Sequence, residues 1–244
     1  MIIDSKETKT RILSKFLEIS PLEGWNDQAL LIAIRECHID EKYAELIFEN
    51  GCLTLAEFYI SEQNLAAIEN VEKIKDFHNK KIRDKITIFL NERFNVEKDN
   101  QIALQRLINF YLNPQNFIST SLGIRPMTQA LKACYQIADS MWLAIKDQST
   151  DFNFYTKRLT LAKIILRSLM VFVKDESEGF VQTRDFIDSQ IAKVMKFEKR
   201  KMQMKNIVNE VFLNNDNGSK SFKPKSPREF IKDLPFVRLM KFKK

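Results

Sequence analysis

Apolar residues in the first part of the chain recur three and four positions apart, which is the spacing of one face of an α-helix. This pattern predicts a first helix around Phe16 and a second helix that Asn26 or Asp27 can cap and that runs to about Cys37. A short third helix follows over residues 41–50 and ends at Gly51. Three short helices in this order form a candidate helix-turn-helix unit.

The predicted third helix carries the wrong charge for a DNA-binding helix. Its sequence EKYAELIFEN places Glu41, Glu45 and Glu49 four residues apart on one face. Its only basic residue is Lys42. In a major groove these carboxylates would face phosphates and oppose the counterion release that drives non-specific binding. The sequence therefore predicts a helix-turn-helix shape that has lost DNA binding.

The remainder of the chain predicts further helices. Residues 55–94 are helical but weakly patterned, and a helix over 102–112 ends before Pro114. The clearest helical stripe follows, at Leu131, Cys134, Tyr135, Ala138, Met141, Trp142 and Ile145. An apolar helix over 154–173 and a long helix over 180–212 come next.

Composition favours an all-α fold, because 244 residues include only 5 glycines and 6 prolines, which is too few for a hairpin-rich sheet. The pattern divides the chain into N-terminal helices over 1–54 and a larger helical domain over 55–213. A linker over 214–227 and a C-terminal tail over 228–244 follow. The most apolar run, 159–173, is too short and too charged to span a bilayer.

The positive charge is concentrated at the C-terminal end. The net charge of the chain is +7, but residues 191–244 hold 15 Lys and Arg against 5 Asp and Glu and so carry +10. Such a segment fits an anionic membrane surface or a nucleic acid.

Motifs for common enzyme chemistry are missing from the sequence. The glycines are too far apart for a phosphate-binding loop, and neither His38 nor His78 lies in a metal-ligand pattern. Cys37 adjoins His38, but neighbouring residues on a helix do not face each other. Three cysteines without a CxxC pair are typical of a reducing compartment. We therefore expect neither a metal site nor catalysis.

The segment STDFNFYTKR, residues 149–158, is not explained by helix patterning alone. Its first three residues can cap the following helix, and Phe152 can pack onto it. An aromatic pair beside a basic pair is also typical of a recognition surface, because Tyr and Arg dominate many interfaces. A structural cap and a binding patch both fit the residues.

This segment resembles the signature of the ubiquinone-biosynthesis accessory family COQ9. The family pattern is STDFNWYTKR, and the residue that differs here is Phe154 in place of tryptophan. The later FVQTRDFIDSQIAKVMKFEK and the opening TRILSKFLEISPLEGWNDQAL are also similar to the family. The similarity covers residues 10–50 and 130–200 and is weak over 55–123.

The resemblance implies the fold of TetR transcription regulators, with a helix-turn-helix end that does not bind DNA. It implies a non-catalytic protein without a cofactor that binds an isoprenoid or quinone lipid and presents a polyprenylated quinone precursor to the di-iron demethoxyubiquinone hydroxylase. The contact with that hydroxylase carries over to Asp151, Asn153, Phe154, Tyr155, Lys157 and Arg158. For the lipid pocket we expect Trp142, Ile165, Leu169 and Phe172, although core packing alone would also place them inside.

The family's membrane contact would fall on the C-terminal tail, at Phe230, Leu234, Phe236, Arg238, Met240, Lys241 and Phe242. Pro235 interrupts a single helix there, so an arm that covers the domain is an alternative. With no targeting segment before the first helix, we expect a cytoplasmic protein, peripheral on the inner membrane of a bacterium. For a processed chain the expected location is the mitochondrial matrix.

A TetR-type regulator that binds DNA as a dimer and responds to a ligand is the rival interpretation. The shape of the N-terminal helices favours it, and a homodimer would suit either function. The acidic third helix argues against it, so we expect no nucleic-acid partner.

Overall fold

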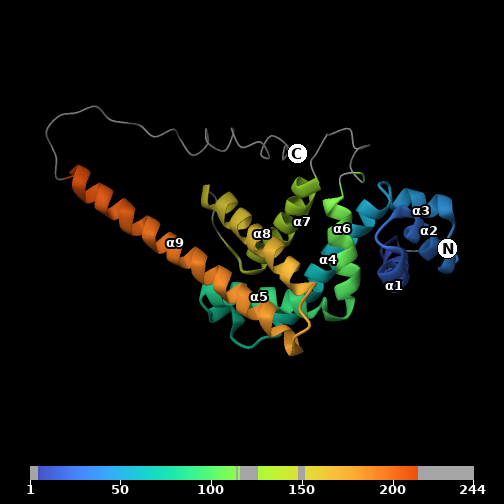
Figure 1. The fold of residues 1–244 in the computed structure, drawn as a ribbon, viewed down its shortest axis with the longest axis horizontal. Coiled ribbons are helices and arrows are strands. Elements are labelled where there is room, and N and C mark those ends of the chain that lie inside the picture. Colours follow the sequence, from blue (N-terminus) through green and yellow to red (C-terminus); the bar gives the residue numbers. More distant parts are fainter. Residues whose placement is uncertain (1–4, 114, 116–125, 148–151, 214–244) are drawn as a thin grey trace.

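The computed structural model describes residues 5–113, 115, 126–147 and 152–213 (Figure 1). Within these ranges the regular elements are helices and no strand occurs, which confirms the predicted all-α class. In chain order the α-helices are α1 (Ser5–Glu23), α2 (Asp27–Glu36), α3 (Glu41–Ile47), α4 (Cys52–Glu72), α5 (Ile82–Asn95), α6 (Gln101–Leu112), α7 (Pro126–Ala144), α8 (Phe152–Phe172) and α9 (Val181–Leu213). The likeness to TetR regulators and the division into domains stay predictions.

The first helices begin at capping side chains. Asn26 accepts a hydrogen bond from the backbone N–H three residues on (2.9 Å) at the start of α2. Asp40 starts α3 in the same way (3.0 Å). α3 ends at Ile47, earlier than the predicted residue 50, because the buried Phe48 leaves helical geometry. Gly51, at a φ of 53°, then turns the chain into α4.

An aromatic cluster joins the N-terminal helices to α4. The ring of Trp25 lies 4.7 Å from that of Phe16 and 5.6 Å from that of Tyr59, measured between centroids. Its indole N–H donates to the carbonyl of Cys52 (3.3 Å). All four residues are buried, so the N-terminal helices share one hydrophobic core with the helices that follow.

The acidic face predicted for the third helix lies on the surface. Glu41, Glu45 and Glu49 are exposed, although Glu49 follows the end of α3. Glu41 accepts a hydrogen bond from Nε of Arg35 (2.7 Å), which leaves the other two carboxylates to set the charge of this surface. The arrangement agrees with the expected loss of DNA binding, which itself stays a prediction.

The helices α7 and α8 pack against each other. Of the apolar stripe predicted over α7, Leu131 and Tyr135 are half-buried and the other five residues are buried, including Ile145 just after the helix. On the other side α8 packs against α9, where Ile187 and Ile191 are buried. The hairpin of α7 and α8 therefore contributes buried side chains to the core on both of its sides.

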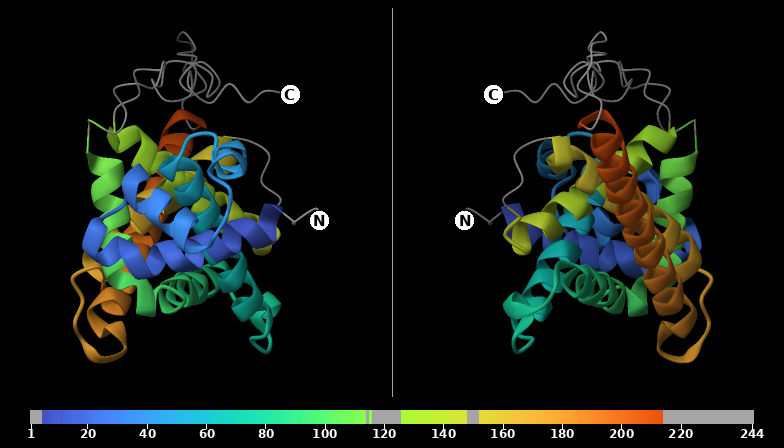
Figure 2. Two further views of the ribbon diagram at one scale, coloured as in Figure 1. Left: turned by 90° about the vertical axis from the view of Figure 1, so that its right-hand side faces the viewer. Right: turned by 90° about the vertical axis from the view of Figure 1, so that its left-hand side faces the viewer.

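The helix α9 extends beyond the rest of the fold (Figure 1). It packs against α8 and α5 through its first half, and Figure 2 shows it on the side of the molecule opposite α1, α2 and α3. From Met195 to Arg200 every side chain is exposed, including Phe197 at 65%. Within the described ranges, none of the helices has the length and apolar character needed to cross a membrane.

The corner between α8 and α9 is held by the buried carboxylate of Asp175. It accepts hydrogen bonds from the hydroxyl and N–H of Ser177 (2.5 and 3.0 Å) and from the hydroxyl and N–H of Thr183 (2.6 and 2.8 Å). Burial alone would raise the pKa of Asp175, but these hydrogen bonds outweigh it and lower the pKa below its ordinary value of 3.8. The ionised form therefore stabilises the corner.

We expect Asp175→Asn to lower the melting temperature at neutral pH, because the amide cannot accept all four hydrogen bonds. Since the folded pKa of Asp175 lies below the unfolded one, its contribution is complete above the unfolded pKa and is lost as the pH falls through the folded pKa. The gap between wild type and variant should narrow as thermal melts are taken from pH 7 to pH 3. A gap that stays constant would show that the charge of Asp175 has no role.

Candidate functional site

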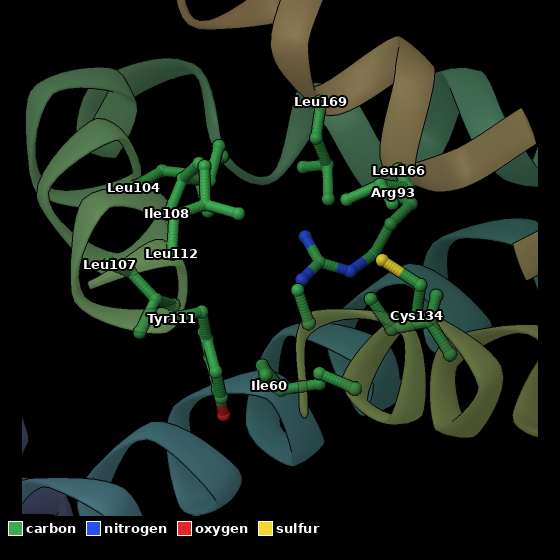
Figure 3. A pocket seen from close by; sticks show the side chains of 13 residues that line it. Ile60, Arg93, Leu104, Leu107, Ile108, Tyr111, Leu112, Cys134, Leu166 and Leu169 are labelled. Atoms are coloured by element: carbon green, nitrogen blue, oxygen red, sulfur yellow. The ribbon is translucent and has the colours of Figure 1, made fainter. Parts of the chain in front are cut away.

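A partly open cavity lies between five helices in the centre of the fold (Figure 3). Its volume is ≈ 40 Å³, which is room for a few water molecules. Its walls are almost entirely apolar. The lining residues are Ile60, Arg93, Leu104, Leu107, Ile108, Tyr111, Leu112, Ala130, Ala133, Cys134, Ile137, Leu166 and Leu169.

One of the four predicted lipid-binding residues lines this cavity. Leu169 does so from α8, whereas Trp142, Ile165 and Phe172 are buried elsewhere in the core. The ring of Phe172 packs against those of Phe94 (5.0 Å) and Phe180 (4.8 Å). Packing against Phe94 of α5 and against Phe180, just before α9, therefore explains the burial of Phe172, which is the core-packing role that the sequence also allowed.

The largest share of the cavity wall comes from α6, which sequence reasoning did not assign to the site. Five of the thirteen lining residues, from Leu104 to Leu112, lie on this helix. The signal was available, because these leucines, an isoleucine and a tyrosine recur at helical spacing. They face Ala130, Ala133 and Cys134 of α7, whose small side chains leave the space between the two helices.

A buried polar cluster borders the cavity and was also missed. Arg93 forms an ion pair with Glu97 through Nη1 and donates from Nε to the side-chain oxygen of Asn64 (3.0 Å). The hydroxyl of Tyr59 donates to the other carboxylate oxygen of Glu97. Arg93 is 4% exposed and Glu97 0%. Burial and the neighbouring Glu97 raise the pKa of Tyr59 well above its ordinary value, so Tyr59 remains a hydrogen-bond donor.

The thiol of Cys134 faces the same cavity. Complete burial raises its pKa to about 12, so the thiol stays protonated at neutral pH. A protonated buried thiol packs as a small apolar group and is not a nucleophile. Among the described residues, no group of three or more His, Cys, Asp or Glu could hold a metal ion.

The STDFNFYTKR segment lies at the start of α8. Residues 148–151, with Asp151, are outside the described residues, and Asn153 belongs to α8 while its side chain is not described. Tyr155 is 45% exposed and its ring packs edge-on against that of Phe154 (5.1 Å). Lys157 is half-buried, with Nζ 2.9 Å from Asp147 and 5.1 Å from the centre of the Trp142 ring.

The position of Arg158 does not suit the predicted contact with the hydroxylase, because its side chain is 0% exposed. Its Nε lies 2.5 Å from a carboxylate oxygen of Asp139 and its Nη1 lies 3.6 Å from Asp147. Nη1 also donates to the carbonyl of Phe154 (3.2 Å), and the guanidinium lies 3.3 Å from the centre of the Phe154 ring. Arg158 therefore links α7 to α8 and packs against the inner side of Phe154, whose ring contacts Tyr155. It does not itself form part of an exposed docking surface.

The predicted membrane-contacting residues of the tail, from Phe230 to Phe242, lie outside the described residues. So does the predicted linker over 214–227. Their roles stay predictions.

Comparison with known proteins supports the similarity inferred from the sequence. Residues 127–198 match the model of the COQ9 family. The predicted resemblance to COQ9 is confirmed. The matched COQ9 region contains α7, α8 and the first half of α9, and with them the STDFNFYTKR segment. It excludes α6 and therefore much of the cavity wall.

Curated COQ9 proteins match a longer part of the chain. The mitochondrial ubiquinone biosynthesis protein COQ9 of Bos taurus is 25% identical over 211 residues, which are 82% of this chain and 61% of that protein. The Homo sapiens protein of the same name is 24% identical over the same shares. A probable mitochondrial COQ9 of Dictyostelium discoideum is 22% identical over 83% of this chain and 64% of its own. The chain thus spans about three-fifths of the length of these relatives.

Proposed function

We propose that the chain is a non-catalytic accessory protein of ubiquinone biosynthesis. It binds a polyprenylated quinone precursor and presents it to the di-iron demethoxyubiquinone hydroxylase at a membrane. The observation that carries this proposal is an apolar cavity in a chain whose relatives are ubiquinone biosynthesis proteins. For the cell compartment, the names of the relatives favour the mitochondrion over the bacterial inner membrane.

The cavity must widen to take such a lipid. Pockets for drug-sized ligands measure about 300–1,000 Å³, whereas this cavity has ≈ 40 Å³. Ala130 and Ala133 of α7 and five residues of α6 line the cavity, and the two alanine side chains are small. We therefore place the entry of the hydrocarbon chain between these two helices.

Native mass spectrometry of the purified protein, with organic extraction of bound molecules, tests the lipid-carrying role. We expect an isoprenoid or quinone to copurify with the wild type. Ala133→Phe fills the cavity and should lose this lipid, while Ala192→Phe, on an exposed position of α9, should retain it. A lipid-free wild-type protein that still binds the hydroxylase would keep the docking role and remove the carrier role.

The exposed ring of Tyr155 is the part of the STDFNFYTKR segment best placed to contact the hydroxylase. We expect Tyr155→Ser to weaken hydroxylase binding about thirtyfold, since a central aromatic contact contributes about 2 kcal/mol. The melting temperature should change by less than about 2 °C, because the ring is surface-exposed. The measurement is surface plasmon resonance with immobilised hydroxylase.

Met170→Ser is the matched control for Tyr155, because Met170 is exposed on the same helix but lies far from its start. It should bind the hydroxylase like the wild type. If Tyr155→Ser also binds like the wild type, the docking surface lies elsewhere.

The basic tail is proposed to hold the protein on the membrane. Each Lys or Arg near an anionic surface contributes about 1 kcal/mol, and each buried Phe about 2 kcal/mol. The six basic residues from Arg228 to Lys244 that alternate with apolar ones fit this role.

A further inference from the structure

The wall of the cavity contains one charged group that a purely hydrocarbon ligand would not need. Among the thirteen described lining residues, Arg93 is the only one whose side chain carries a charge. In Figure 3 its guanidinium points from α5 into the space between α6 and α7. The other lining side chains offer hydrocarbon, one thiol and one phenol ring.

A structural role alone does not account well for Arg93. Replacing a buried ion pair by apolar residues of similar volume is often neutral or stabilising, so such a pair is weak evidence for stability. The hydrogen bonds of Arg93 to Asn64 and Glu97 use Nε and Nη1. A guanidinium carries more N–H donors than these two bonds use, and the side that faces the cavity can donate to a ligand.

The charge balance of the wall favours a neutral acceptor. Glu97 compensates the charge of Arg93, and no second cation lies among the described lining residues. A phosphate in the cavity would bring further negative charge close to Glu97 in surroundings of low dielectric, where like charges repel strongly. A carbonyl, phenol or methoxy oxygen accepts a hydrogen bond without this cost.

We propose that Arg93 recognises the head group of the lipid by donating a hydrogen bond to a neutral oxygen of a quinone or phenol ring. The isoprenoid chain then lies against Leu104, Leu107 and Ile108 of α6 and Leu166 of α8. The cavity selects a ring-bearing isoprenoid over an isoprenyl phosphate. This inference rests on the proposed binding of a quinone precursor and adds the residue that recognises its head group.

Titration calorimetry of the purified full-length protein with three ligands in dilute detergent tests the inference. The ligands are a methoxybenzoquinone with one isoprene unit, an isoprenoid hydrocarbon without oxygen, and an isoprenyl monophosphate. The double variant Arg93→Met/Glu97→Gln removes both charges and keeps an acceptor for Tyr59. It should bind the quinone about tenfold more weakly or worse and the hydrocarbon with unchanged affinity.

Arg83→Met is the matched control, since Arg83 is exposed on the same helix. It should bind both ligands like the wild type. If the double variant does not fold, Arg93→Lys replaces it in the test. Lysine keeps the positive charge but lacks the planar guanidinium with its paired donors, so this variant should also weaken quinone binding selectively.

The inference is overturned if the charge-free variant binds the quinone as tightly as the wild type, or if the wild type prefers the phosphate. In both cases binding of the hydrocarbon would leave the lipid-carrying function intact. A wild type that binds none of the three ligands would instead refute the proposed function, and this inference with it.

Discussion

Arg158→Met will destabilise the protein by about 3 kcal/mol, which corresponds to a fall in melting temperature of about 10 °C. The guanidinium is fully buried and lies within ion-pair distance of Asp139 and Asp147. Removing it leaves Asp147, whose side chain is nearly buried, with less compensating charge. It also removes the contact that supports the ring of Phe154. Thermal melts followed by circular dichroism measure the effect.

Arg167→Met provides the comparison for Arg158, because Arg167 is exposed on the same helix. It should shift stability by no more than about 0.5 kcal/mol. If Arg158→Met has the melting temperature of the wild type, the buried ion pairs do not stabilise the hairpin of α7 and α8.

The second large effect is expected at Glu97. Glu97→Gln leaves the charge of Arg93 buried and uncompensated, which costs about 3 kcal/mol or more. Arg93→Met/Glu97→Gln should recover most of this loss, because it removes the uncompensated charge as well. Urea unfolding of the two single variants and the double variant gives the coupling energy.

Additive losses in this cycle would contradict the account of Arg93 and Glu97 as one unit. They would mean that each side chain stabilises the fold through separate contacts. Arg83→Met again supplies the control for loss of a positive charge on α5.

Helical periodicity predicted most of the fold, because the buried face of a long amphipathic helix is visible as apolar residues spaced three and four positions apart. The apolar stripe on α7 was found in this way. The break between α4 and α5 was not, since it depends on Asp76 in the left-handed region at a φ of 61°. Asp tolerates that geometry, but its local sequence does not require it.

The site was harder to predict than the helices, because it depends on which helices meet. Arg93 and Glu97 lie four residues apart, yet the same spacing occurs in ordinary surface pairs. Their importance follows from burial by neighbouring helices, which no local pattern encodes. Lys157 and Arg158 are adjacent and both carry a positive charge. The helix nevertheless leaves Lys157 half-buried beside Asp147 and places Arg158 in the interior.

The protruding half of α9 has a mechanical consequence. A continuous helix of 33 residues is about 50 Å long, and the chain continues from its far end. If the tail is anchored to a bilayer, α9 is a rigid spacer that sets the distance between the apolar cavity and the lipid headgroups. Shortening α9 by whole turns would bring the cavity closer to the membrane in steps of about 5 Å. The length of α9 would then set the distance that a lipid travels between the membrane and the cavity.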